Sequence, residues 1–237
     1  MSLYNIAGLT VQGDFRFDTM QSRAEKYLCR EQKKPDIIVE ITPRLWEESK
    51  AEYPYLDDEE LELIISGFVF YAKLLDFSGF MLHSSAVALD GNAYLFSAPS
   101  GTGKSTHTEQ WIRLFGERAA VINDDKPALR CIDGRFFAFG TPWSGKNDIS
   151  ENVCVPVRGI CMLERSPHNF IEPLPPERAV FELMNQTVRV PDEGCMDKLM
   201  TMLDLVIGNV PLWHMGCNIS TDAAQMAYTA MSAPASR

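Results

Sequence analysis

The fold of this chain is decided by the stretch Ala98-Pro99-Ser100-Gly101-Thr102-Gly103-Lys104-Ser105. This stretch fits the Walker A pattern, with alanine in place of the first glycine. Small residues let backbone N–H groups turn toward phosphate oxygens, and a helix that begins there adds partial positive charge. In this motif Lys104 reaches the outer phosphates and the Ser105 hydroxyl binds Mg²⁺. The sequence therefore predicts a site for the phosphates of a nucleotide.

The residues on either side of the loop support this interpretation. Apolar residues 94–96 predict a strand before the loop, and a helical pattern follows from Lys104 to Phe115. A strand–loop–helix order is the context that the motif requires, whereas an ordinary glycine-rich turn is the alternative. The predicted nucleotide-binding residues are Ala98, Pro99, Ser100, Gly101, Thr102, Gly103, Lys104, Ser105 and Thr106.

A pair of carboxylates follows the next apolar strand. Residues 119–122 are apolar, and Asn123-Asp124-Asp125 come directly after them. A phosphate loop needs an acidic group at the end of a nearby strand to hold its metal, and a second carboxylate can take a proton from an attacking hydroxyl. Both side chains reach one site only if the chain turns there. We expect Asp124 to hold Mg²⁺ together with Ser105, and Asp125 to act as the base; a solvated turn before Pro127 is the alternative.

Hydrophobic patterning predicts a mixed α/β domain over residues 80–237 and a small N-terminal α+β region over residues 1–79. Strands are expected at Tyr4–Val11, Asp14–Phe17, Ile37–Ile41, Phe80–Leu89, Ala93–Ser97, Ala119–Ile122, Leu129–Cys131, Phe136–Phe139, Val157–Leu163 and Leu212–Met215. Further helices are expected after Asp57, at Glu177–Val188, at Met196–Ile207 and after Ser220 or Thr221. The helix after Asp57 is expected to turn Leu61, Ile64, Ile65, Phe68, Ala72 and Leu75 toward the core.

The composition excludes some classes of partner. The chain has 22 Lys and Arg against 32 Asp and Glu, which gives a net charge of −10 and argues against binding nucleic acid or an anionic membrane. Its longest apolar stretch, Leu63–Ala72, is about half the length of a membrane span, and the first residues do not resemble a signal peptide. The six cysteines have no zinc or redox spacing. We expect a cytoplasmic protein with reduced thiols.

The order of these motifs resembles a known family. Met81-Leu82-His83-Ser84 precedes the phosphate loop, and Asn-Asp-Asp follows it, as in the catalytic domain of HPr kinase/phosphorylase and, more distantly, ATP-dependent phosphoenolpyruvate carboxykinase. The resemblance implies their shared P-loop fold, a mixed sheet flanked by helices, in a short form without the long N-terminal domain. It implies that His83 lies near the transferred phosphate, and that Asp124 and Asp125 bind metal and activate the acceptor. It also implies a homo-oligomer. Without the resemblance, a lone histidine on an apolar strand is more often a core residue.

The segment after the acidic strand departs from that family. Phe139–Asp148 contains glycine and proline, an aromatic residue at Trp143 that could serve as a platform, and Lys146, which could touch phosphate. We interpret Gly140–Asn147 as a substrate loop, with an ordinary surface hairpin as the alternative. Three arginines are candidates for stabilising charge, namely Arg158, Arg165 and Arg189. His107 either touches the nucleotide or lies on the helix surface.

The sequence thus predicts an enzyme that uses ATP and Mg²⁺. We expect a kinase that transfers the γ-phosphate to a hydroxyl, either on a serine of a protein or peptide or on a small molecule. Two alternatives stay open: a carboxykinase-like reaction on an oxyacid, and a non-catalytic nucleotide sensor or assembly module.

Overall fold

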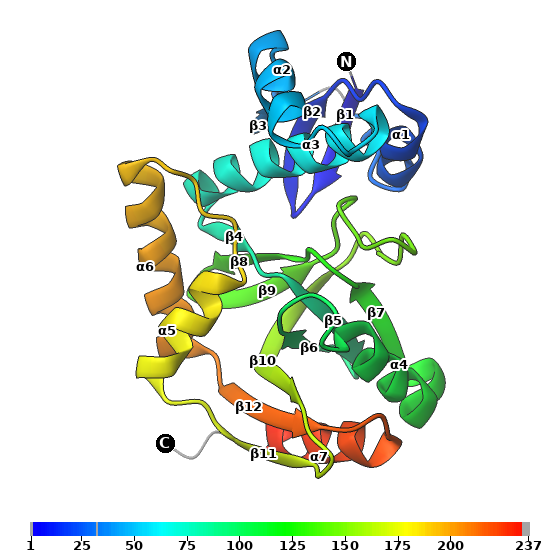
Figure 1. Ribbon diagram of the computed structural model, residues 1–237, viewed down its shortest axis with the longest axis vertical. Helices are drawn as coiled ribbons and strands as arrows, with labels where there is room; N and C mark the ends of the chain where they lie inside the picture. The colour runs from blue at the N-terminus through cyan, green and yellow to red at the C-terminus, as the bar shows by residue number, and fades with distance from the viewer. Residues whose placement is uncertain (1, 32, 234–237) are drawn as a thin grey trace.

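The computed structural model describes residues 2–31 and 33–233, which form two sheets and the helices around them (Figure 1). The first sheet contains β1 (Ser2–Ile6), β2 (Leu9–Gly13) and β3 (Ile37–Val39). β1 runs antiparallel to β2, and β3 runs parallel to it. The second sheet is larger and also mixed, so the chain has the α/β class that the sequence predicts.

The larger sheet has nine strands within the described residues. Seven follow the order β4 (Gly79–Met81), β8 (Ala128–Ile132), β9 (Arg135–Phe139), β10 (Cys154–Arg165), β6 (Asn92–Ser97), β5 (Ser84–Leu89) and β7 (Ala119–Asn123), with β12 (Leu212–Cys217) beside β10 and β11 (Phe170–Pro173) beside β12. β10 joins the two halves, because it pairs antiparallel with β9 at its start and parallel with β6 and β12 farther on.

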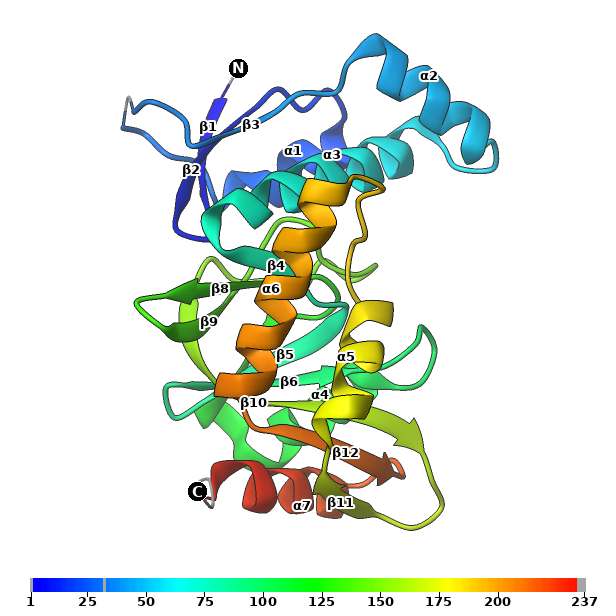
Figure 2. The same cartoon turned by 90° about the vertical axis from the view of Figure 1, so that its left-hand side faces the viewer.

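Helices cover both faces of this sheet (Figure 2). α5 (Pro176–Asn185) and α6 (Glu193–Asn209) pack on one face, and α4 (Lys104–Phe115) and α7 (Thr221–Ser232) pack on the other. Successive residues of a strand point to opposite faces. Accordingly Leu95 joins the hydrophobic cluster of α5 and α6, whereas Phe96 joins the cluster of α4 and α7. The predicted flanking of the sheet by helices is therefore confirmed.

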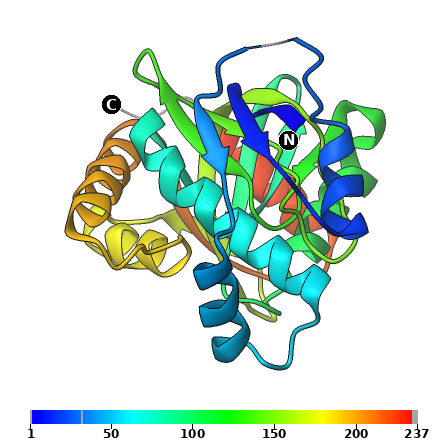
Figure 3. The ribbon, with the colours of Figure 1, turned by 90° about the horizontal axis from the view of Figure 1, so that it is seen from above.

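The N-terminal sheet lies over α3 (Asp58–Leu74), with α1 (Asp18–Glu25) and α2 (Pro43–Glu52) beside it (Figure 3). Short 3₁₀ turns occupy Leu75–Phe77 (η1) and Gly116–Arg118 (η2). The hydrophobic cluster under the N-terminal sheet also includes Met81, Phe139 and Trp143 from the rest of the chain. The two predicted segments thus share a core, and a domain boundary at residue 79 stays a prediction.

The prediction of which α3 residues face the core is partly wrong. Ile64 and Phe68 are 44% and 37% exposed, whereas the polar residues Glu62 and Ser66 are fully buried. The carboxylate of Glu62 accepts the backbone N–H groups of Arg16 and Phe17, at 2.7 and 3.0 Å. Ser66 accepts a hydrogen bond from the indole of a buried tryptophan. Hydrogen bonds to residues distant in sequence offset the cost of burying these polar groups. A hydrophobic pattern does not reveal such partners.

Three predicted strands also need correction. Tyr4–Val11 is divided into β1 and β2 by a turn at Ala7-Gly8, both with positive φ. Asp14–Phe17 is not a strand but leads into α1, and Glu62 accepts the N–H groups of Arg16 and Phe17 just before that helix. Phe80–Leu89 is divided into β4 and β5 at residues 82–83. The helix α2 was missed, although Thr42 caps it and Pro43 stands at its first position.

Helix caps and tight turns follow from local sequence at several other positions. Asp57 caps α3 by accepting the Glu60 N–H at 2.8 Å, and Ser220 caps α7. Asp90-Gly91 and Asp133-Gly134 form hairpin turns with positive φ at both residues, which aspartate and glycine tolerate. All six cysteines are free. Within the described residues, no helix has both the length and the apolar character that crossing a membrane requires.

Candidate functional site

The predicted phosphate loop connects β6 directly to α4. The loop leaves the sheet at Ala98, which is buried, and α4 begins at Lys104. Gly101 and Gly103 have φ values of +79° and +117°, a region that residues with a Cβ rarely adopt. The two glycines therefore let the loop turn tightly, so that the first N–H groups of α4 face outward at the end of the sheet.

Lys104 folds back over this loop. Its Nζ donates to the carbonyl oxygen of Ala98 at 2.9 Å and lies 3.0 Å from Nε2 of His83. Burial lowers the pKa of Lys104, and the nearby charge of Asp125 opposes that effect. The ammonium group is therefore poorly solvated, so an anion in front of the loop would be a favourable partner for it.

His83 lies between β4 and β5 and not on a strand as predicted. Its Nδ1 is 2.9 Å from Oε1 of Gln186, and its backbone N–H donates to the Gln186 carbonyl oxygen at 2.6 Å. A Gln oxygen accepts only, so Nδ1 donates to it. This arrangement leaves Nε2 facing the site, 3.0 Å from Lys104 and 3.2 Å from Oδ1 of Asp125.

The acidic pair lies where β7 ends and the chain turns. Oδ1 of Asn123 accepts the N–H groups of Asp125 and Lys126, at 2.9 and 2.7 Å. This side-chain turn replaces the next strand hydrogen bonds and ends the extended conformation. Asp124 and Asp125 consequently line the same cleft. The turn that the prediction required is present.

The two carboxylates have different electrostatic surroundings. Burial raises the pKa of Asp124, and repulsion from Asp125 adds to that effect, although the Gly145 N–H donates to Oδ1 at 2.8 Å and lowers it. Burial would also raise the pKa of Asp125, but hydrogen bonding to His83 and the charge of Lys126 outweigh it, so the pKa lies well below its usual value. Asp125 is an ion-paired anion, whereas Asp124 has no cation in contact among the described residues.

The cleft in front of the loop has a volume of about 480 Å³. It is lined by His83, Ser100, Gly101, Gly103, Lys104, Ser105, Thr106, Asp124, Asp125, Gly145, Lys146, Asn147 and Arg165. The structure thus brings together the predicted histidine, lysine, serine and carboxylates. Ala98 and Pro99 are not among the residues that line this cleft, and Thr102 lines a second pocket beside the loop.

The loop that we predicted to contact substrate forms one wall of this cleft, through Gly145, Lys146 and Asn147. A Cβ on Gly145 would lie 2.9 Å from the carboxylate of Asp124, so only glycine permits the close approach. The prediction for Trp143 is wrong, because its ring is 1% exposed and stacks on Phe70 at 4.6 Å. Trp143 anchors the loop in the core instead of offering a platform to substrate.

Residues from α1 and the segment just after it hold the same loop in place. Arg23 donates to the carbonyl oxygen of Ser144 at 2.9 Å and lies 3.9 Å from Asp148. Lys26 donates to the carbonyl oxygen of Ser150 at 2.6 Å, and the Tyr27 hydroxyl is 3.1 Å from that serine's Oγ. The N-terminal part of the chain therefore positions a wall of the cleft.

The structure separates the three candidate arginines. Arg165 lines the cleft and donates to the carbonyl oxygens of Gly101 and Thr102. Arg158 instead donates to Ser232 and Ala233 at the end of α7, and Arg189 is exposed away from the cleft lining. His107 is buried, so its placement on the helix surface is excluded.

The sequence patterns did not predict two residues that belong to the site. Gln186 orients His83 from 103 residues away, and no local pattern marks it. Lys126 follows the acidic pair directly and pairs with Asp125, so adjacency to two carboxylates was an available signal. No group of three or more metal-binding His, Cys, Asp or Glu side chains occurs in the described ranges.

Comparison with known proteins establishes the family. The family model described as "SynChlorMet cassette protein ScmC" matches residues 56–201, more than half of the chain, so the chain belongs to this family. No curated protein matches it. Among solved structures, the chain is similar to the Hpr(Ser) kinase/phosphatase from Coxiella burnetii, with 12% identity over 63% of this chain and 93% of the other, and a TM-score of 0.37. A likeness at that level does not establish a shared fold or activity.

Proposed function

We propose that this chain is an ATP-dependent kinase that transfers the γ-phosphate to a hydroxyl group. The observation that carries the proposal is the convergence of Lys104, His83 and Asp125 within 3.0–3.2 Å contacts at the start of α4, with Asp124 in the same cleft. A phosphate loop, a metal-binding carboxylate and a base are the parts that phosphoryl transfer requires. We also propose an HPr kinase-like P-loop fold for this domain.

The residues present fit Mg²⁺. The Ser105 side chain is exposed at the start of α4, and Asp124 lines the same cleft with no cationic side chain of the described residues in contact. Carboxylate, hydroxyl and phosphate oxygens are the ligands that Mg²⁺ prefers. Burial raises the pKa of Asp124 and the charge of Asp125 adds to this effect, so a cation bound at the carboxylate would offset both. When bound there, the ion would neutralise charge on the phosphates.

Asp125 has the role of proton acceptor in this proposal. Its carboxylate contacts His83 and Lys126, and an anion so paired accepts protons poorly. Phosphate oxygens compete for both basic groups. As His83 and Lys126 turn to the phosphates, Asp125 loses its partners, its pKa rises, and it can take the proton of an incoming hydroxyl.

Lys146 and Asn147 face the cleft from the loop opposite the phosphate loop, which suits contact with the acceptor or with the transferred phosphate. We propose an acceptor hydroxyl on a protein or peptide serine or on a small molecule. A cytoplasmic location and a homo-oligomeric state remain part of the same proposal.

The test is incubation with γ-labelled ATP and a protein, peptide and metabolite extract of the source cell. The wild type should transfer label to a discrete species. Asp125→Asn keeps shape and polarity but removes the base, so transfer should fall by roughly 10²–10⁴-fold while ATP affinity stays within a few-fold. Asp133→Asn, in the exposed β8–β9 turn, makes the same chemical change away from the cleft and should label like the wild type.

The result separates the proposal from its alternatives. ATP binding without transfer to any acceptor would indicate a sensor. Transfer that Asp125→Asn leaves intact would contradict the assignment of the base. Transfer of label from ATP to oxaloacetate, giving labelled phosphoenolpyruvate, ADP and carbon dioxide, would indicate carboxykinase-like chemistry.

A further inference from the structure

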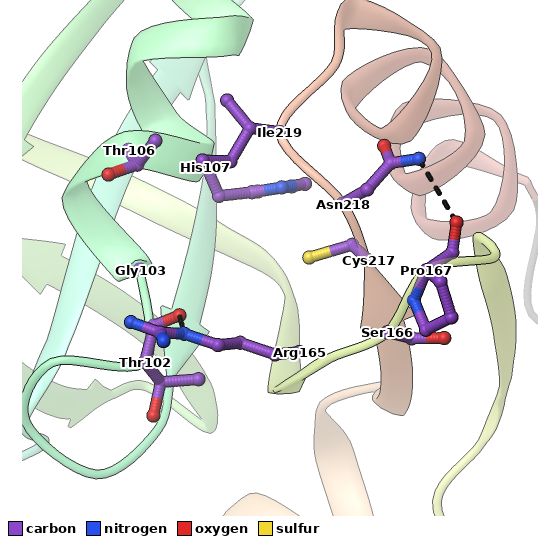
Figure 4. A pocket seen from close by; sticks show the side chains of 10 residues that line it. All are labelled: Thr102, Gly103, Thr106, His107, Arg165, Ser166, Pro167, Cys217, Asn218 and Ile219. Carbon is purple, nitrogen blue, oxygen red and sulfur yellow. Dashed lines mark hydrogen bonds between the residues drawn. The ribbon is translucent and has the colours of Figure 1, made fainter.

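We infer that the second pocket beside the phosphate loop receives the base and ribose of the nucleotide, an inference that rests on the proposed function. This nucleoside pocket lies between the start of α4 and the loops that follow β10 and β12 (Figure 4). Its volume of about 510 Å³ falls within the roughly 300–1,000 Å³ range of small-molecule sites.

The nucleoside pocket and the phosphate cleft share walls. Gly103, Thr106 and Arg165 line both spaces, and Thr102 lines the pocket from within the phosphate loop. Arg165 stabilises this shared wall by donating hydrogen bonds to the carbonyl oxygens of Gly101 and Thr102 in the loop. A single molecule can therefore extend around the start of α4, with its phosphates in the cleft and a neutral group in the pocket.

The chemistry of the lining changes on passing from the cleft to the pocket. No carboxylate lines the pocket, and Arg165 is its single charged residue among those described. Ile219 is 77% exposed and stands at the pocket opposite the phosphate loop (Figure 4). An uncharged, flat base can cover such an aliphatic side chain, whereas phosphates favour the charged cleft.

The wall that carries Ile219 is held by internal hydrogen bonds. The Asn218 N–H donates to Oδ1 of Asn169 at 2.9 Å, and its own Oδ1 accepts from the Ser220 hydroxyl at 2.6 Å. The Asn218 amide also donates to the carbonyl oxygen of Pro167 at 3.4 Å, as Figure 4 shows. Because these polar groups satisfy one another, the wall is preformed and its isoleucine is free to contact a ligand.

A buried histidine supplies the second observation that points to a ligand. His107 is 4% exposed and extends from α4 into the pocket toward Cys217 (Figure 4). Its Nε2 accepts the indole N–H of Trp111 at 3.2 Å, so Nδ1 carries the proton of the neutral ring. That Nδ1–H is buried and has no hydrogen-bond partner among the described residues. Ring nitrogens of a base and ribose oxygens are acceptors that a small turn of the ring would bring to it.

The experiment compares ATP·Mg²⁺ with tripolyphosphate·Mg²⁺ by titration calorimetry. Both carry three phosphates, and only ATP carries a nucleoside. Ile219→Ser should weaken the binding of ATP by about tenfold and leave the affinity for tripolyphosphate unchanged. His107→Phe keeps an aromatic ring against Phe96. It should also weaken the binding of ATP without changing the affinity for tripolyphosphate. Phe181→Ser removes a large apolar side chain of similar exposure, 71%, from α5 and should change neither affinity.

Each other outcome overturns a stated claim. Wild-type protein that binds both ligands equally, or ATP affinity unaltered by both pocket variants, would overturn the nucleoside pocket and leave the phosphate site standing. Wild-type protein that binds neither ligand would overturn the proposed function and the pocket together. Thermal melting of His107→Phe identifies any loss of folding. If that variant does not fold, the ATP affinity of Ile219→Ser, a change at an exposed position, decides whether the nucleoside pocket exists.

Discussion

The two spaces that flank the phosphate loop share three residues and yet differ in chemistry. The cleft contains His83, two carboxylates and lysines, whereas the nucleoside pocket contains aliphatic groups, a thiol and one buried imidazole. The loop itself supplies backbone N–H groups, which suit phosphate wherever they occur. The difference lies in the side chains that other elements bring to each side of the loop. In our proposal these side chains decide where phosphoryl transfer takes place and where the nucleoside is recognised.

Lys104→Ala should give the largest effect in a test of this comparison, because in our proposal Lys104 contacts the phosphates and no other part of the ligand. We expect the affinity for ATP·Mg²⁺ and for tripolyphosphate·Mg²⁺ to fall alike, by roughly 10²-fold or more. Titration calorimetry measures both. Lys198→Ala, which removes an exposed lysine on α6, is the control. Unchanged affinity in Lys104→Ala would refute the phosphate site itself.

Asp124→Asn tests whether the two carboxylates of the cleft have separate roles. The amide oxygen can still accept the Gly145 N–H, but the negative charge is lost. We expect the Mg²⁺ concentration needed for ATP binding to rise by at least about tenfold, the scale seen when groups around a metal are removed. Asp125→Asn should leave that concentration within a few-fold of the wild type. Equal effects of the two substitutions on Mg²⁺ dependence would show that the carboxylates act as one unit.

Arg23→Ala tests the contribution of the N-terminal part to the charged side, with the smallest expected effect. Loss of its bond to Ser144 should loosen the loop that carries Lys146. Once the acceptor is known, its KM should rise by about threefold to tenfold, while ATP affinity stays constant. Arg44→Ala on α2 removes an exposed arginine far from this loop and serves as the control. Altered ATP affinity with an unchanged acceptor KM would contradict the assignment of this loop to the acceptor.

Local sequence patterns predicted much of the fold because their physical causes are local. The glycines of the phosphate loop and the Asp-Gly hairpins need only the backbone conformations that these residues favour. Caps at Asp57 and Ser220 involve neighbours three residues away. The predictions failed where a distant group satisfied the backbone, as Glu62 does at the start of α1. A hydrophobic pattern cannot report a partner 46 residues away.

By itself, the sequence determined the glycine-rich loop, the strand before it, the helix after it and the place of the acidic pair, because consecutive residues specify each of them. Only the tertiary structure decided that His83 meets Asp125 and Lys104, since Gln186 and the division between β4 and β5 orient the imidazole. The nucleoside pocket also depends on tertiary structure, because β10 and β12 are parallel neighbours and bring two distant loops to the start of α4. Consecutive residues specify backbone conformation, and long-range pairing specifies which side chains share a site.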